Sequence, residues 1–259
     1  MRVRILGCSG GIGGPSLRTT AMLVDHDILI DAGTGVGDLS IAELVQIDHV
    51  FITHSHLDHI ACLPLIGDSV GDLREKPLTV YATQPTIAIL RQHIFNGSVW
   101  PDFTRIPNAE RPFLRFQEIR PGQVVTLDAG SASRKITALP ANHTVPAVGY
   151  HLDSGQASLV FTGDTCACEE FWQEVNDISN LRYLIVETAF ADHEAELAHL
   201  SMHFHAVALA AELTRLRRPA ELFITHLKAG QGELIMQEIE ACLGKYRPRR
   251  LESNYVFDF

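Results

Sequence analysis

The feature that most constrains this chain is a run of four potential metal ligands inside the segment 51–59, FITHSHLDH. Residues 50–53 are mostly apolar and predict a buried strand, and on an extended chain residues two apart point to the same side. His54 and His56 can therefore bind one ion together, while a turn after them would bring Asp58 and His59 to a neighbouring position. Imidazole and carboxylate ligands suit zinc, and also iron or manganese. The run therefore predicts a metal site rather than a chance cluster of surface histidines.

Short apolar segments alternate with amphipathic ones along the whole chain. Strand patterns occur at 2–6, 20–24, 28–31, 50–53, 78–82, 124–127, 135–139, 148–152, 158–162, 183–186, 221–225 and 254–257. Helix patterns occur at 39–45, after Asp38 as the cap, and at 85–95, 169–175, 203–216 and 233–243. Because both strand-rich halves gain helices, we expect an α/β fold with two face-to-face sheets and helices outside. This is a four-layer αββα sandwich, with residues 1–259 as a single domain.

The charge balance limits the partners. The chain has 21 basic and 31 acidic residues, a formal net charge of −10, which argues against a protein that binds long nucleic acids through their phosphates. A small anionic substrate remains compatible, because metal ions supply local positive charge. We therefore expect no stable nucleic-acid complex.

The cysteines and the hydropathy indicate the compartment. Five cysteines in 259 residues are an odd number, so reduced thiols are expected rather than a disulfide framework. The N-terminal segment lacks a signal-peptide pattern, and no apolar run reaches the roughly 18 residues of a membrane span. These observations predict a cytoplasmic protein without a membrane partner. A homodimer is compatible with them, since dimers are common among soluble enzymes.

The run 54–59, HSHLDH, resembles the metal motif of the metallo-β-lactamase superfamily, and the family's other landmarks are present in order. Asp31 ends an early strand, as the family's first aspartate does, and Asp164 follows Gly163 where the bridging aspartate belongs. The resemblance implies two divalent ions, most simply zinc, with manganese or iron as alternatives. It assigns the first ion to His54, His56 and His143, the second to Asp58, His59 and His226, and the bridge to Asp164. Asp31 would support the ligands from outside, although an ordinary strand-end aspartate is the alternative.

Other segments resemble one branch of this superfamily. The glycine-rich loop 7–14 is similar to that of the phosphodiesterase branch, which includes ribonuclease Z, and the 54–59 run also resembles class II cyclic-nucleotide phosphodiesterases. The resemblance implies that Glu187 supports His199, which would protonate the leaving oxygen. An ordinary polar helix start is the alternative. We interpret His203 and His205 as a solvated helix face without a role.

Two residues are candidates for substrate contacts. Lys228 lies two residues beyond His226 and could bind a phosphate as a mobile point charge, although a plain surface lysine explains it equally well. Trp100 lies in the long irregular stretch 96–112, where an aromatic wall could stack on a nucleobase. The alternative for this stretch is a satellite apolar cluster under a long loop.

Together these patterns favour a dinuclear metal-dependent phosphodiesterase acting on 3′,5′-cyclic AMP or a related cyclic nucleotide. A hydroxide bridging the two metals would attack phosphorus. Asp58, Glu187 and His199 are the predicted catalytic residues. The alternatives are a ribonuclease Z-like nuclease, an ester or lactone hydrolase on the same site, or a metal-binding module without catalysis.

Overall fold

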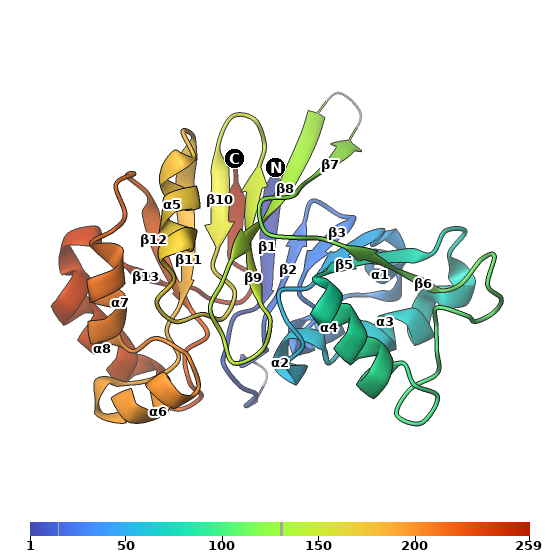
Figure 1. Cartoon of the computed structure of the whole chain (residues 1–259), viewed down its shortest axis with the longest axis horizontal. Coiled ribbons are helices and arrows are strands. Elements are labelled where there is room, and N and C mark those ends of the chain that lie inside the picture. The colour runs from blue at the N-terminus through green and yellow to red at the C-terminus, as the bar shows by residue number, and fades with distance from the viewer. Residues whose placement is uncertain (15, 130–131) are drawn as a thin grey trace.

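Two seven-stranded sheets form the centre of the computed structural model, which describes residues 1–14, 16–129 and 132–259 (Figure 1). The first sheet has the order β14-β1-β2-β3-β4-β5-β6. Its strands are β14 (Val256–Asp258), β1 (Arg2–Gly7), β2 (Ala21–Val24), β3 (Ile28–Ile30), β4 (His49–Phe51), β5 (Leu78–Ala82) and β6 (Leu114–Glu118). The second sheet has the order β13-β12-β11-β10-β9-β8-β7. Its strands are β13 (Arg249–Arg250), β12 (Glu221–Thr225), β11 (Leu181–Glu187), β10 (Ser158–Phe161), β9 (Val148–Asp153), β8 (Ala132–Pro140) and β7 (Val124–Ala129).

Helices cover the outer face of each sheet (Figure 1). The first sheet carries α1 (Ile41–Gln46), α2 (Leu57–Ile60), α3 (Leu63–Val70) and α4 (Gln84–Ile89), which a π-helical turn extends over Leu90–Ile94. The second carries α5 (Glu169–Asp177), α7 (Ala206–Leu213) and α8 (Gly232–Leu243), whereas α6 (Ala195–Leu200) lies below them and packs through Ala198 against Ala189 and Phe190.

Three apolar clusters match the three interfaces between four layers. One joins the first sheet to its helices, a second joins the other sheet to α5, α7 and α8, and a third lies between the sheets, with Phe51, Tyr150 and Phe223 among its buried members. Burial of these side chains stabilises the sandwich at roughly 25 cal/mol per Å² of apolar surface removed from water. The predicted four-layer αββα fold is confirmed.

Some local predictions were wrong. The cap of α1 is Ser40, not Asp38: Ser40 accepts a hydrogen bond from the Glu43 amide, and the Glu43 carboxylate accepts one from the Ser40 amide. The predicted helix 203–216 begins only at Ala206. Strand β6 was not predicted: it is a short edge strand, and its sequence LRFQE has only two apolar residues, which makes its alternating pattern a weak signal.

The parallel strands position the site. Strands β3 to β6 run parallel to one another, as do β10 to β13, so the residues that follow them emerge at shared sheet edges. The 54–59 run follows β4, Asp164 follows β10, and His226 follows β12. Asp31 and His226 both have left-handed backbone conformations, with φ of 57° and 64°, where the chain turns sharply off its strand.

Candidate metal centre

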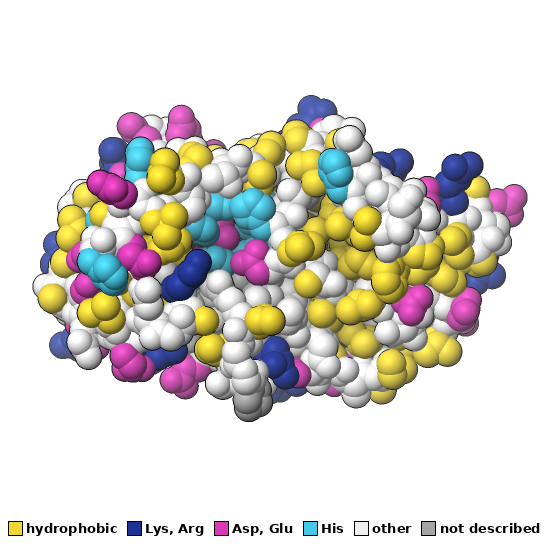
Figure 2. Space-filling view, turned by 90° about the horizontal axis from the view of Figure 1, so that it is seen from below, with side chains coloured by type: hydrophobic (Ala, Val, Ile, Leu, Met, Phe, Trp, Pro, Cys, Tyr) yellow, Lys and Arg dark blue, Asp and Glu magenta, His cyan; other side chains and the backbone are white. Residues whose placement is uncertain are grey.

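Seven predicted ligands from four separate segments meet at one place. Figure 2 shows histidine side chains gathered in a hollow near the middle of one face, with acidic side chains beside them. The ligand atoms form two groups of four, within each of which all ligand atoms lie within 4.8 Å of one another. The first group is His54, His56, His143 and Asp164, and the second is Asp58, His59, Asp164 and His226.

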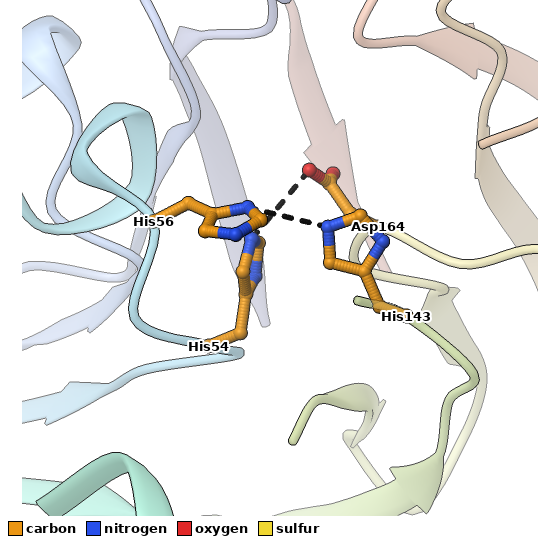
Figure 3. A group of neighbouring side chains, drawn as sticks. All are labelled: His54, His56, His143 and Asp164. Atoms are coloured by element: carbon orange, nitrogen blue, oxygen red, sulfur yellow. Dashed lines mark hydrogen bonds and ion pairs between the residues drawn. The ribbon is translucent and has the colours of Figure 1, made fainter. Parts of the chain in front are cut away.

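The first group has the spacing of ligands that converge on one ion (Figure 3). His56 Nδ1 lies 3.2 Å from His143 Nε2, and His54 Nε2 lies 3.6 Å from Asp164 Oδ2. Two nitrogens bound to a tetrahedral zinc at 2.0–2.1 Å would lie about 3.3 Å apart. The three imidazoles thus stand where ligands of one ion would stand.

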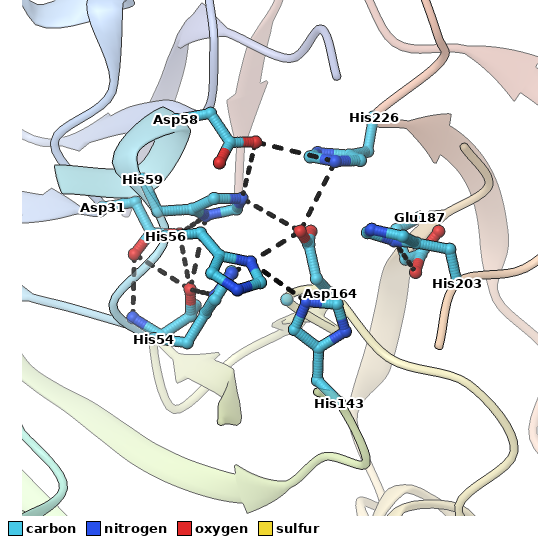
Figure 4. A network of polar contacts seen from close by, with 12 residues as sticks. Asp31, His54, His56, Asp58, His59, His143, Asp164, Glu187, His203 and His226 are labelled. Carbon is cyan, nitrogen blue, oxygen red and sulfur yellow. Dashed lines mark hydrogen bonds and ion pairs between the residues drawn. The ribbon is translucent and has the colours of Figure 1, made fainter. Parts of the chain in front are cut away.

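The second group surrounds the same aspartate (Figure 4). Asp164 Oδ2 lies 3.2 Å from His59 Nε2 and 3.4 Å from His226 Nε2. Asp58 Oδ2 lies 3.5 Å and 3.7 Å from the same two nitrogens. Asp164 is the one residue shared by the two groups, so it stands in the position that the resemblance gives to a bridging ligand.

The polar atoms of this cluster fit a bound cation. His54 Nε2, His59 Nε2 and Asp164 Oδ1 are buried and have no hydrogen-bond partner among the described residues. Leaving such groups unsatisfied costs about 1–3 kcal/mol each. Burial also lowers the pKa of His54, His56 and His143, the last to about 4, so these imidazoles are neutral at pH 7. Neutral imidazole is the form that binds metal, so the three histidines of the first group are suited to a divalent ion.

Asp31 lies behind the ligands, as predicted from the resemblance. Its side chain is fully buried, and Oδ2 accepts a hydrogen bond from His59 Nδ1 at 2.7 Å. Oδ1 accepts one from the backbone amide of Thr53 at 2.8 Å. This contact fixes the orientation of the His59 ring and leaves Nε2 directed at the centre.

The predicted contact between Glu187 and His199 was wrong. Glu187 Oε1 accepts a hydrogen bond from His203 Nδ1 at 2.8 Å, while His199 lies exposed on α6. His203 belongs to a turn before α7 rather than to the helix, and its side chain is only 12% exposed. The interpretation of His203 as part of a solvated helix face is therefore also corrected. Figure 4 shows the His203–Glu187 pair beside His143, Asp164 and His226.

The ring of His203 touches both metal groups. It lies 4.8 Å from the ring of His143 and 5.2 Å, nearly parallel, from that of His226, measured between ring centroids. The pKa of His203 is raised: burial opposes protonation, but the charge of Glu187 and its hydrogen bond outweigh that effect. The Glu187 carboxylate thus favours the protonated form of an imidazole that lies at the rim of the metal centre.

The two predicted substrate contacts lie in different places. Lys228 is exposed, and its Nζ sits 4.9 Å above the ring of Phe190, whose centroid is 5.8 Å from that of His203. Lys228 is therefore on the same side of the centre as His203. Trp100 is partly buried against the apolar cluster of the first sheet and its helices. Its packing favours the alternative of a satellite cluster over the predicted aromatic wall.

Removing divalent metal is expected to destabilise the protein. A ligand that binds only the folded state at a thousandfold above its Kd adds about 4 kcal/mol, which for a chain of this size corresponds to roughly 10 °C in Tm. Thermal unfolding of a zinc-loaded sample and of a chelated, dialysed sample would measure the difference. Restoring zinc, but not magnesium, should restore the Tm. Identical Tm values in all samples would contradict a built metal centre.

Comparisons with known proteins agree with this geometry. A family model described as "Beta-lactamase superfamily domain" matches residues 26–227. A probable 3′,5′-cyclic-nucleotide phosphodiesterase of Yersinia pestis is 31% identical over 75% of this chain and 63% of its own length. A ribonuclease Z of Haloarcula marismortui is 30% identical over 66% of this chain and 53% of its own length. The chain thus spans less than two thirds of either curated relative.

A solved structure shows the same fold over the whole chain. The structure of unliganded yeast PDE1 is 18% identical, with a TM-score of 0.81, and the match covers 100% of this chain and 99% of that one. In the described part of the chain, no helix is long and apolar enough to cross a membrane. Since the family model covers most of the sequence and the two sheets enclose the family's ligand pattern, the chain belongs to the metallo-β-lactamase superfamily.

Proposed function

We propose that the protein is a dinuclear metal-dependent phosphodiesterase that hydrolyses 3′,5′-cyclic AMP or a related small cyclic nucleotide. The observation that carries the proposal is the His203–Glu187 pair beside two ligand groups that share Asp164. Opening of a cyclic ribose phosphodiester expels an alkoxide, which is a poor leaving group, so a proton donor beside the metals suits this reaction. Esters and lactones also expel alkoxides, and the name of the relative from Yersinia pestis is what favours a phosphodiester over them.

His203 is suited to this donor role. Its Nδ1 hydrogen is held by Glu187, so Nε2 is the nitrogen available to a substrate oxygen. Glu187 is a positioning residue: its Oε1 also accepts a hydrogen bond from the Thr165 amide at 3.1 Å, next to Asp164. The carboxylate therefore orients the proton donor and the loop of the shared ligand together.

The other residues bind and orient the phosphate. Two divalent ions, most simply zinc, would supply an activated water and positive charge opposite the phosphate oxygens. His54, His56 and His143 would hold one ion, Asp58, His59 and His226 the other, and Asp164 both. Lys228, on the His203 side, would attract the anionic substrate through a mobile ammonium group. The name of the relative from Yersinia pestis supports a cyclic nucleotide as the substrate class.

The decisive test is hydrolysis of 3′,5′-cyclic AMP. The zinc-loaded protein is expected to open the cyclic ester, with formation of adenosine monophosphate followed by chromatography, and a chelated sample to lose the activity until zinc is restored. A cyclic GMP sample run in parallel would report the base preference. If a protein with two bound ions leaves both cyclic nucleotides intact, the cyclic-nucleotide substrate is wrong.

Ribonuclease Z activity is the alternative, and the relative from Haloarcula marismortui supports it. The net charge of −10 argues against tight transfer RNA binding. Incubation with a precursor transfer RNA, together with a gel-shift assay at low salt, separates the two functions. Cleavage of the precursor with no turnover of cyclic nucleotides would replace the proposal by the nuclease.

A further inference from the structure

We propose that Thr53 is a positioning residue that connects one buried carboxylate to a ligand of each metal group. The inference rests on the proposed metal centre but not on a phosphodiester substrate. Thr53 is fully buried and directly precedes His54. Its hydroxyl lies 3.0 Å from His54 Nδ1, 3.4 Å from His59 Nδ1 and 2.9 Å from Asp31 Oδ2. One hydroxyl thus touches a histidine of the first group, a histidine of the second and the aspartate behind them.

The number of protons sets the direction of these hydrogen bonds. A threonine hydroxyl carries one proton, and an ionised carboxylate can only accept. The hydroxyl proton therefore goes to Asp31, which leaves the oxygen of Thr53 as the acceptor for His54 Nδ1–H. His59 Nδ1–H donates to Asp31 directly at 2.7 Å. The chain of donors runs from His54 through Thr53 to Asp31, and from His59 to the same carboxylate.

This order fixes the tautomers of both histidines. With the proton of each ring on Nδ1, the lone pair is on Nε2 in both. His54 Nε2 and His59 Nε2 are two of the buried nitrogens without a hydrogen-bond partner in the described chain, and both face Asp164. Asp31 reaches His59 by itself but reaches His54 only through Thr53. Without the hydroxyl, the Nδ1–H of His54 would be buried without an acceptor, and its ring could turn away from the first ion.

The roles of the hydroxyl and the methyl group of Thr53 can be tested one at a time with two variants. A Cβ built on Gly163 would lie 3.3 Å from Thr53 Cγ2, so the methyl group packs against the residue before Asp164. Thr53→Val keeps the volume and the methyl contact and removes the hydroxyl. Thr53→Ser keeps the hydroxyl and removes the methyl. Thr86→Val is a matched control, because Thr86 is fully buried and hydrogen-bonded to Thr83 and Pro146 outside the metal centre.

Zinc affinity, measured by competition with a chromophoric chelator, is the main readout. Loss of an outer hydrogen-bond partner typically lowers metal affinity about 10- to 100-fold. We expect that loss in Thr53→Val, chiefly at the group of His54, with affinity near that of the unaltered protein in Thr53→Ser and Thr86→Val. Circular dichroism of the metal-free samples checks that all are folded. Unaltered zinc affinity in a folded Thr53→Val protein would overturn the role of Thr53.

A spectroscopic measurement on the unaltered protein does not depend on any variant folding. Nitrogen-15 correlation spectra of the zinc-loaded protein should show both His54 and His59 as Nδ1–H tautomers, with the Nδ1 proton of His54 protected from solvent exchange. An Nε2–H tautomer at His54 would overturn the proposal. Failure of the unaltered protein to bind zinc at all would overturn the metal centre and the proposed function with it. Zinc binding with a rapidly exchanging His54 proton would overturn only the contribution of Thr53.

Discussion

Replacing Asp164 by asparagine is expected to lower cyclic-nucleotide turnover by at least about a thousandfold and to leave fewer than two ions bound. Asp164 is 2% exposed and is the one residue common to both ligand groups. Its Oδ2 lies within 3.6 Å of ring nitrogens of His54, His59 and His226. An amide keeps the shape but removes the negative charge that two cations would share. Metal stabilisation of a transition state is worth several kcal/mol, and about 4 kcal/mol corresponds to a thousandfold in rate.

Metal content per chain and kcat/KM, measured on the same preparation, check this result. Asp153→Asn is a suitable control, because Asp153 is a hydrogen-bonded aspartate on β9 that contacts Asn180 and Ser158 rather than a predicted ligand. The control should retain two ions and full turnover. An Asp164→Asn protein with two tightly bound ions and ordinary turnover would show that the shared carboxylate does not bridge the metals.

The ligand set could be predicted from the sequence because each ligand closely follows a strand. The 54–59 run fixes four of the seven residues by spacing alone, His226 comes directly after the buried strand β12, and Asp164 comes three residues after the end of β10. Within each sheet the parallel strands end at a common edge, and the ligands converge because the ligand-bearing ends of the two packed sheets meet. The structure brings all seven residues into two groups with shared Asp164, as the resemblance implied.

The partner of Glu187 could not be predicted, because it depends on where the chain turns back. After α6, Met202 has a left-handed φ of 55°, and His205 forms a β-bridge with Phe190. This reversal places His203 over the end of β11, and His199 stays outside. The sequence analysis extended the helix pattern back to residue 203 and therefore missed the turn. The apolar periodicity of α7 does not show at which residue the helix begins. The pair of histidines at 203 and 205, flanking a buried Phe204, was the one signal of an extended segment there.

The roles of the two candidate substrate-contact residues also could not be predicted from the sequence. Trp100 and Lys228 were each compatible with a substrate role and with a bland one. Only the packing in the folded protein distinguishes a substrate contact from a structural role, because a tryptophan in a long loop can face the core or the solvent. Trp100 packs against the apolar cluster of the first sheet and its helices. Lys228 is held near the metal centre by two contacts: its backbone amide donates a hydrogen bond to the Ala189 carbonyl, and its ammonium group lies over the ring of Phe190.

Replacing His203 by alanine is expected to lower kcat for cyclic AMP about 100- to 10,000-fold, the range for a general acid, while His199→Ala leaves it within about twofold. His203 is oriented by Glu187 and stacks on His226, whereas His199 is exposed on α6. The two variants compare histidines only four residues apart, one inside the centre and one outside. Steady-state kinetics at saturating zinc, with metal content measured alongside, isolates the proton donor from metal loss.

The substrate can be used to prove that the lost function is proton donation. Bis(p-nitrophenyl) phosphate releases a nitrophenolate, which leaves readily without being protonated, so His203→Ala should lose far less activity on it than on cyclic AMP. A variant that had lost its metals or its fold would lose both activities alike, and so would one in which His203 merely positions His143 or His226. Equal losses on the two substrates would therefore remove His203 from the proton-donor role. A selective loss on cyclic AMP would tie the His203–Glu187 pair to cleavage of an alkoxide leaving group.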